Sequence, residues 1–140
     1  MSLYFLDTDT LSLFERAHPA VVNRATSLRP EDILAITVIS VEEQLSGWYS
    51  MIRQAKRAKT VAHAYQRLAD TAKALSDFEI YSFTELAIQQ YEHLVRLKLN
   101  IGGMDLRIAA VALENNAILV TCNLKDFRRV PNLVIEDWSN

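Results

Sequence analysis

The chain has 140 residues, of which 50% are hydrophobic and 23% are charged, and its formal net charge is −2 at pH 7. This composition is typical of a globular protein, and the length suits a single domain over residues 1–140. The small net charge does not mark a nucleic-acid binder, so any such contact must rest on a local patch. The single cysteine excludes an internal disulfide and is compatible with a reducing cytoplasm. The apolar N-terminal run lacks a basic flank and is interrupted by Asp7, so we expect neither a signal peptide nor a membrane span.

The first nine residues, MSLYFLDTD, combine an apolar run with two carboxylates. Residues 3–6 predict a strand that is buried on both faces, as in a parallel sheet. Asp7 falls at the carboxyl end of this strand, where parallel sheets bind their ligands, and Asp9 follows two residues later. Both are therefore candidate cation ligands. The alternative is that they cap the next helix, because an aspartate there satisfies free N–H groups.

Strands and helices alternate along the rest of the chain. We expect, in chain order, helices over 8–16 and 19–28, a strand over 33–39, a helix from 40, a long helix over 53–76, a strand over 78–83, helices over 84–99 and 104–115, a strand over 117–121, a polar connection over 123–129 and a short strand over 133–135. This alternation predicts right-handed crossovers and an α/β fold. Its central sheet is mainly parallel, has four to five strands and carries helices on both faces.

Two further carboxylates follow predicted strands or open predicted helices. Glu43 lies in Ser40-Val-Glu-Glu43, which has the spacing of a capping box and opens a helix that Gly47 weakens or bends. Its position after the second strand makes it a candidate ligand as well. Asp105 opens an otherwise apolar helix, where a charge is costly to bury without a partner or a metal. The alternative for Asp105 is a first-turn aspartate that the helix dipole favours.

Asn123 and Asp126 follow the strand over 117–121 and are ordinary turn formers when taken alone. If the strands are parallel, however, their loop converges with Asp7, Glu43 and Asp105 at one end of the sheet. Oxygen ligands without histidine or cysteine suit Mg²⁺ or Mn²⁺. Such an ion can activate a bound water and stabilise a phosphate under attack. The chemistry that this pattern predicts is phosphodiester hydrolysis.

A run of basic residues lies in the middle of the chain. A solvated helix face is the simpler interpretation, and a local patch for a polyanion is the alternative. The run consists of Arg53, Lys56, Arg57, Lys59 and Arg67.

Five segments of the chain resemble the motifs of PIN-domain proteins, in the order and at the spacings usual for that family. The segments are LDTD at 6–9, ISVEEQLSG at 39–47, GMDLRIAA at 103–110, LVTCNLKDF at 119–127 and EDW at 136–138. More narrowly, the chain resembles the VapC-type ribonuclease toxins of bacterial toxin–antitoxin pairs. The resemblance runs nearly end to end.

The resemblance implies roles for particular residues. Asp7, Glu43 and Asp105 match the three acidic metal ligands and catalytic positions of the family. Thr8 and Thr121 match the small hydroxyl residues that flank the acidic site, and Asn123 stands at the family's fourth acidic position. Asp9 is a candidate auxiliary ligand, and Asp126 is a candidate to supply the charge that Asn123 lacks.

The resemblance also implies a three-layer PIN-like fold and a Mg²⁺- or Mn²⁺-dependent endoribonuclease that acts on structured or translation-related RNA. It implies a cytoplasmic homodimer that a cognate antitoxin inhibits by covering the site with its C-terminal segment. We expect Arg53, Lys56 and Arg57 to flank the RNA path or to contact the antitoxin.

Two other functions are compatible with parts of the pattern. One is a non-catalytic PIN-like module that binds RNA or protein, because Asn123 weakens the acidic set. The other is a HAD-type phosphatase, in which Asp7 and Asp9 would be the nucleophile and the acid/base. Leu11 stands where that family has Thr or Val, and its paired acids near the end are not found, which speaks against the phosphatase.

Overall fold

The computed structural model describes residues 1–140. Five strands form one sheet: β1 (Leu3–Leu6), β2 (Ile33–Thr37), β3 (Glu79–Tyr81), β4 (Ile118–Val120) and β5 (Val134–Glu136). Seven helices accompany them: α1 (Thr8–Glu15), α2 (Pro19–Thr26), α3 (Val38–Gln54), α4 (Ala58–Leu75), α5 (Glu85–Arg96), α6 (Gly103–Glu114) and α7 (Leu124–Phe127). None of the helices combines the length and the apolar character needed to cross a membrane.

The sheet has the order β3-β2-β1-β4-β5, and every neighbouring pair is parallel. β1 lies at the centre, with Tyr4 paired to Leu34 of β2 and Phe5 paired to Leu119 of β4. Since all five strands run the same way, their carboxyl ends meet at one edge of the sheet. The parallel α/β sheet expected from the sequence is confirmed, and Asp7 leaves β1 at the middle of that edge.

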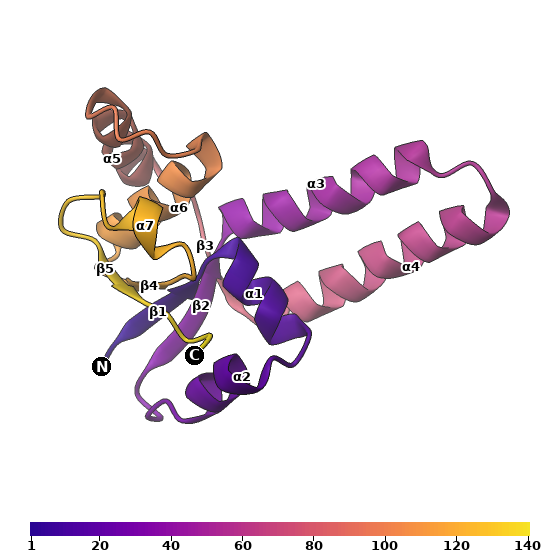
Figure 1. The fold of residues 1–140 in the computed structure, drawn as a ribbon, viewed down its shortest axis with the longest axis horizontal. Helices are drawn as coiled ribbons and strands as arrows, with labels where there is room; N and C mark the ends of the chain where they lie inside the picture. Colours follow the sequence, from indigo (N-terminus) through magenta and orange to yellow (C-terminus); the bar gives the residue numbers. More distant parts are fainter.

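Helices cover both faces of the sheet, as Figure 1 shows. Successive residues of the central strands point to opposite faces. On one face, Phe5, Ala35 and Leu119 pack against α5 and α6 in a core of 15 buried residues. The other face packs against α1, α2 and the end of α4 in a core of seven buried residues, through Leu6, Ile36 and Val120. Burial on both sides explains why these strands are almost continuously apolar.

Helices α3 and α4 form a long antiparallel hairpin that extends away from the sheet (Figure 1). The expected bend at Gly47 is wrong, because α3 runs unbroken from Val38 to Gln54 and the chain turns only at residues 55–57. Gly47 is exposed, and a Cβ there would meet no atom within 4 Å, so packing does not require a glycine. Contacts with α4 sustain α3 in spite of the low helix propensity of glycine.

The expected capping box from Ser40 to Glu43 is also wrong. Helix α3 begins two residues earlier, at Val38, and Thr37 is its N-cap, with the Thr37 hydroxyl accepting from the Ser40 amide at 3.4 Å. Ser40 is therefore a buried residue of the first turn, and the side chain of Glu43 is free for another partner. The connection expected over 123–129 contains the short helix α7.

Candidate metal centre

Asp7 lies at the carboxyl end of β1 and is 4% exposed. It is the N-cap of α1, and its Oδ1 accepts from the Thr10 amide at 2.9 Å. Burial raises the pKa of Asp7 above its ordinary value, while the neighbouring hydroxyls of Thr121 and Thr10 oppose the rise. Capping and ligation are thus compatible, because a carboxylate has a second oxygen to offer. Asp9 lies in the first turn of α1 and is exposed.

Glu43 is brought to Asp7 by Thr8, the residue between the two carboxylates of the first motif. The Thr8 hydroxyl donates to Glu43 Oε1 at 2.6 Å and lies 3.0 Å from the Ser40 hydroxyl. These contacts join the first turn of α1 to the second turn of α3. They hold the Glu43 carboxylate on the side of α3 that faces the sheet edge, where its position after the second strand predicted it.

Asp105 lies in the first turn of α6, one of the most buried helices of the protein. Burial is the largest reason that its pKa rises to about 6, followed by the negative charges of Asp7, Glu43, Asp9 and Asp126, in that order. Four carboxylates from α1, α3, α7 and the end of β1 therefore act on Asp105. The effects of Asp7 and Glu43 on Asp105 place the three predicted ligands near one another at the carboxyl edge of the sheet, without joining them in one ligand shell.

The fourth predicted position is divided between two residues of the β4–α7 region. The Asn123 side-chain amide donates to Asp126 Oδ2 at 3.0 Å. Asp126 also pairs with Arg129 at 3.5 Å, and Arg129 donates to the carbonyls of Leu99 and Asn100 ahead of α6. The charge of Asp126 is thus partly balanced. Thr121, directly after β4, is buried, and its hydroxyl accepts from the backbone amide of Asn123 at 2.9 Å.

The remaining carboxylates of the centre have no cationic partner. None of the five ion pairs in the structure includes any of Asp7, Asp9, Glu43 and Asp105. Carboxylates that repel one another without a counter-charge favour a bound cation, and oxygen donors alone suit Mg²⁺ or Mn²⁺. The residues present fit such an ion.

The centre is not arranged as a closed ligand shell. No three His, Cys, Asp or Glu side chains converge closely enough to hold an ion in this conformation. Asp7 and Glu43 instead accept hydrogen bonds from Thr10 and Thr8. Holding an ion requires the carboxylates to turn towards a common point.

The basic residues predicted to contact RNA or an antitoxin lie elsewhere. Arg53, Lys56 and Arg57 are exposed at the far end of the α3–α4 hairpin (Figure 1). At about 1.5 Å per helical residue, Arg53 lies roughly 15 Å along α3 from Glu43. The structure does not bring these three residues to the carboxylates, so only a partner long enough to span that distance can contact both regions.

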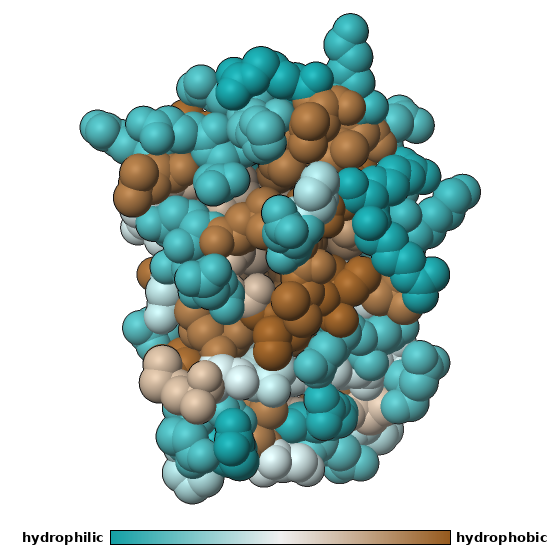
Figure 2. All heavy atoms as spheres, turned by 90° about the vertical axis from the view of Figure 1, so that its left-hand side faces the viewer, coloured by the Kyte–Doolittle hydropathy of each residue, from teal (hydrophilic) through white to brown (hydrophobic).

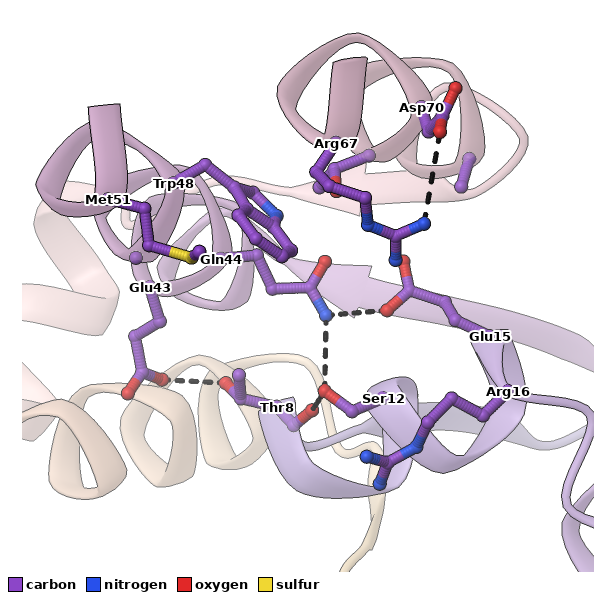
Figure 3. Close-up of a pocket in the computed structure, with 13 residues that line it drawn as sticks. Thr8, Ser12, Glu15, Arg16, Glu43, Gln44, Trp48, Met51, Arg67 and Asp70 are labelled. Carbon is purple, nitrogen blue, oxygen red and sulfur yellow. Dashed lines mark hydrogen bonds and ion pairs between the residues drawn. The ribbon is translucent and has the colours of Figure 1, made fainter. Parts of the chain in front are cut away.

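Sequence reasoning missed a pocket beside the carboxylates. It lies between α1, α3 and α4, has a volume of about 630 Å³, and includes Thr8 and Glu43 in its wall (Figure 3). Trp48 and Arg67 form another part of the wall, with the Arg67 guanidinium 5.5 Å from the centre of the indole ring. The hairpin brings these two residues together, and no local motif indicates that contact.

Comparison with known proteins identifies the family of this chain. The family model described as PIN domain matches residues 4–133. Ribonuclease VapC2 of Rickettsia felis is 31% identical, over 97% of this chain and 98% of its own length. The structure of VapBC-1 from nontypeable Haemophilus influenzae matches with a TM-score of 0.81 and 26% identity, covering 99% of both chains. VapBC2 from Rickettsia felis, bound to a DNA fragment from its promoter, matches with a TM-score of 0.75 and 30% identity, covering 97% of this chain and 98% of that one. The chain therefore belongs to the PIN-domain family.

Proposed function

We propose that this protein is a divalent-metal-dependent endoribonuclease and the toxin of a toxin–antitoxin pair. The observation that carries the proposal is the group of uncompensated carboxylates at the sheet edge, in which Asp105 has a pKa of about 6. A PIN-domain match over residues 4–133 and the similarity to ribonuclease VapC2 support it. Membership of the PIN-domain family also decides against a HAD-type phosphatase.

Asp7, Glu43 and Asp105 are the residues that would hold the ion, and Mg²⁺ or Mn²⁺ is the ion that their oxygens suit. When bound, such an ion supplies an activated water and charge to stabilise the phosphate in the transition state. Two hydrogen bonds orient the carboxylates that would hold the ion: the Thr10 amide donates to Asp7, and the Thr8 hydroxyl donates to Glu43. Asp105 is largely ionised at neutral pH, because its pKa of about 6 lies below 7.

The auxiliary residues act on these ligands in different ways. Thr121 lies beside the carboxyl group of Asp7 and favours its ionised form. Asp9 and Asp126 add negative charge near Asp105. Asn123 brings an amide oxygen to the fourth position and holds Asp126 by its amide nitrogen. We propose that this corner binds a metal more weakly than the other three carboxylates, because Arg129 already balances Asp126.

RNA is the proposed substrate, and a cognate antitoxin is the proposed protein partner, in line with the VapBC complexes that match this chain. We further propose a cytoplasmic homodimer built from a single domain over residues 1–140. Figure 2 shows apolar surface gathered on the side of the molecule where α5 lies. Leu86, Val95 and Leu97, in α5 and just after it, are 60%, 47% and 41% exposed, and apolar surface that is gathered in one place is typical of protein–protein interfaces.

The test of the enzymatic proposal is cleavage of total cellular RNA by the purified protein in Mg²⁺. Wild type should cut RNA, and EDTA should stop it. Asp7→Asn and Asp105→Asn should each lower the rate by more than about 100-fold, because even residues that only orient metal ligands contribute 10- to 100-fold.

Glu31→Gln, an exposed carboxylate outside the centre, is the matched control and should cut like wild type. Circular dichroism of each variant separates loss of the site from loss of the fold. Equal cleavage by all four proteins, or cleavage that persists in EDTA, would refute the proposal. Absence of cleavage by folded wild type would instead favour a module that binds RNA without cutting it.

A further inference from the structure

The pocket between α1, α3 and α4 opens directly beside the carboxylates, because Thr8 and Glu43 belong to both. Figure 3 shows the two residues on one side of the pocket, with Trp48 and Arg67 across from them. A polymer whose phosphate lies at the carboxylate centre would have a neighbouring nucleotide at the mouth of this pocket. Its volume of about 630 Å³ exceeds that of one nucleobase.

Trp48 offers a flat apolar surface in the pocket wall. It lies on α3 one turn after Gln44, is partly exposed, and is held by the Arg67 guanidinium at 5.5 Å from its ring centre. Arg67 also forms an ion pair with Asp70 at 3.8 Å. An indole that packs against a guanidinium is limited in its rotation, and unpaired bases of RNA are commonly bound by stacking on aromatic side chains.

The pocket wall that contains Trp48 also offers hydrogen-bond acceptors. Gln44 Nε2 donates to Glu15 at 2.7 Å and to Ser12 at 3.4 Å, while Gln44 Oε1 is buried and accepts no hydrogen bond. Figure 3 shows this oxygen directed to the side of the pocket where Trp48 and Arg67 lie. A buried acceptor without a donor is costly, so a ligand that supplies an N–H group would relieve that cost.

Charge decides which part of a nucleotide fits. The pocket wall contains more carboxylates than guanidinium groups, with Glu15, Glu43 and Asp70 against Arg16 and Arg67. A phosphate is therefore disfavoured inside the pocket. The edge of a base that carries an amino group suits it, because carboxylate and amide oxygens accept from such groups.

We propose that this pocket is a nucleobase subsite, in which a base next to the scissile phosphate stacks on Trp48 and donates its amino group to the surrounding acceptors. The subsite prefers adenine, guanine and cytosine to uracil. This inference rests on the proposed ribonuclease function and adds to it a determinant of where the RNA is cut.

The test compares binding of the single-stranded hexanucleotides of cytosine and of uracil. Cytosine has an amino group and a ring acceptor at the positions where uracil has a carbonyl oxygen and a ring N–H. Fluorescence of wild type is titrated in EDTA at constant ionic strength. Trp138 is 1% exposed, so quenching on binding reports mainly Trp48. Quenching should saturate, and the cytosine oligomer should bind several-fold more tightly than the uracil oligomer.

Calorimetry then measures the same oligomers with variants. Trp48→Ala should weaken binding by at least about fivefold and reduce the preference for cytosine, whereas Trp48→Phe should retain most of both, because a phenyl ring still stacks. Tyr49→Ala removes the adjacent exposed aromatic residue, which lies outside the pocket, and should leave binding unchanged.

Equal affinities for the two oligomers, or unchanged binding by Trp48→Ala, would overturn the subsite. So would a Trp48→Ala variant that binds RNA normally and loses affinity for hexa-arginine, since the pocket would then hold a basic protein segment. Failure of the ribonuclease proposal appears differently: wild type would bind the oligomers with the expected preference and leave RNA uncut in Mg²⁺.

Discussion

The carboxyl edge of the sheet and the far end of the α3–α4 hairpin carry opposite charges in opposite surroundings. At the sheet edge, Asp7 is buried and Asp105 has its pKa raised to about 6. At the hairpin end, Arg53, Lys56 and Arg57 are exposed to solvent. Buried charges lower the stability of the fold and are suited to binding an ion. Exposed charges change stability little and can contact a partner such as RNA or a protein. The two regions therefore predict different responses to mutation.

The largest expected effect is on stability, and it separates the core of the sheet from the hairpin end. Phe5→Ala should lower the free energy of unfolding by about 3–5 kcal/mol, because Phe5 is fully buried in the larger core. Arg57→Ala should change it by less than about 0.5 kcal/mol. Urea denaturation of both variants checks the difference, and a comparable loss in each would mean that the hairpin end is part of the cooperative core.

A smaller effect concerns the metal-free carboxylate centre and its dependence on pH. The pKa of Asp105 is about 6 in the folded protein and 3.8 when unperturbed, so the folded state binds more protons between these values. The free energy of unfolding should therefore fall as pH rises from 4 to 6, by at most about 3 kcal/mol from this group. Asp105→Asn should remove that part of the fall and make the metal-free protein more stable at pH 7.5.

Asp77→Asn is the matched control, because Asp77 is exposed in the turn after α4. It should leave the pH dependence of wild type intact. Denaturation in EDTA at pH 4, 6 and 7.5 gives the comparison. An Asp105→Asn variant that is less stable than wild type at pH 7.5 would show that the Asp105 carboxylate stabilises the fold rather than destabilising it.

The smallest effect on the fold is expected from reversing the charges at the hairpin end. Arg53→Glu, Lys56→Glu and Arg57→Glu together should leave stability nearly unchanged but weaken RNA binding or antitoxin binding. If these side chains neutralise phosphates, the salt dependence of RNA affinity should become shallower by about 0.7 for each phosphate that is no longer neutralised. Reversal of Lys73, Arg96 and Lys98, which are exposed away from this end, is the control. Unchanged RNA cleavage and antitoxin affinity in the first variant would remove the hairpin end from both interactions.

The sheet and the carboxylates at its edge were accessible from sequence because their signals are local. The run Leu3–Leu6 is apolar and delivers Asp7 at its end, and a parallel sheet places that end beside the others. Asp105 stands out as a charge on the apolar helix α6. Each of these signals concerns residues that are adjacent in the chain.

The hairpin and its pocket were not accessible in the same way. Val38 and Ile39 are β-branched and extend the predicted strand to residue 39, whereas α3 already begins at Val38, so the capping box predicted from Ser40 to Glu43 does not form. Gly47 predicts a weak helix when considered alone, and packing against α4 overrides that preference. Trp48 and Arg67 meet only because the chain turns at residues 55–57.

Calorimetric titration of Mn²⁺ into metal-free wild type, Asp7→Asn and Arg57→Ala is the sharpest test of the metal centre. We expect saturable binding to wild type and to Arg57→Ala, with binding at least about tenfold weaker in Asp7→Asn. Binding to wild type should also raise its stability, by about 2.7 kcal/mol when free Mn²⁺ is 100 times the Kd. Equal Mn²⁺ affinity in all three proteins would contradict the assignment of the carboxyl edge as a metal centre.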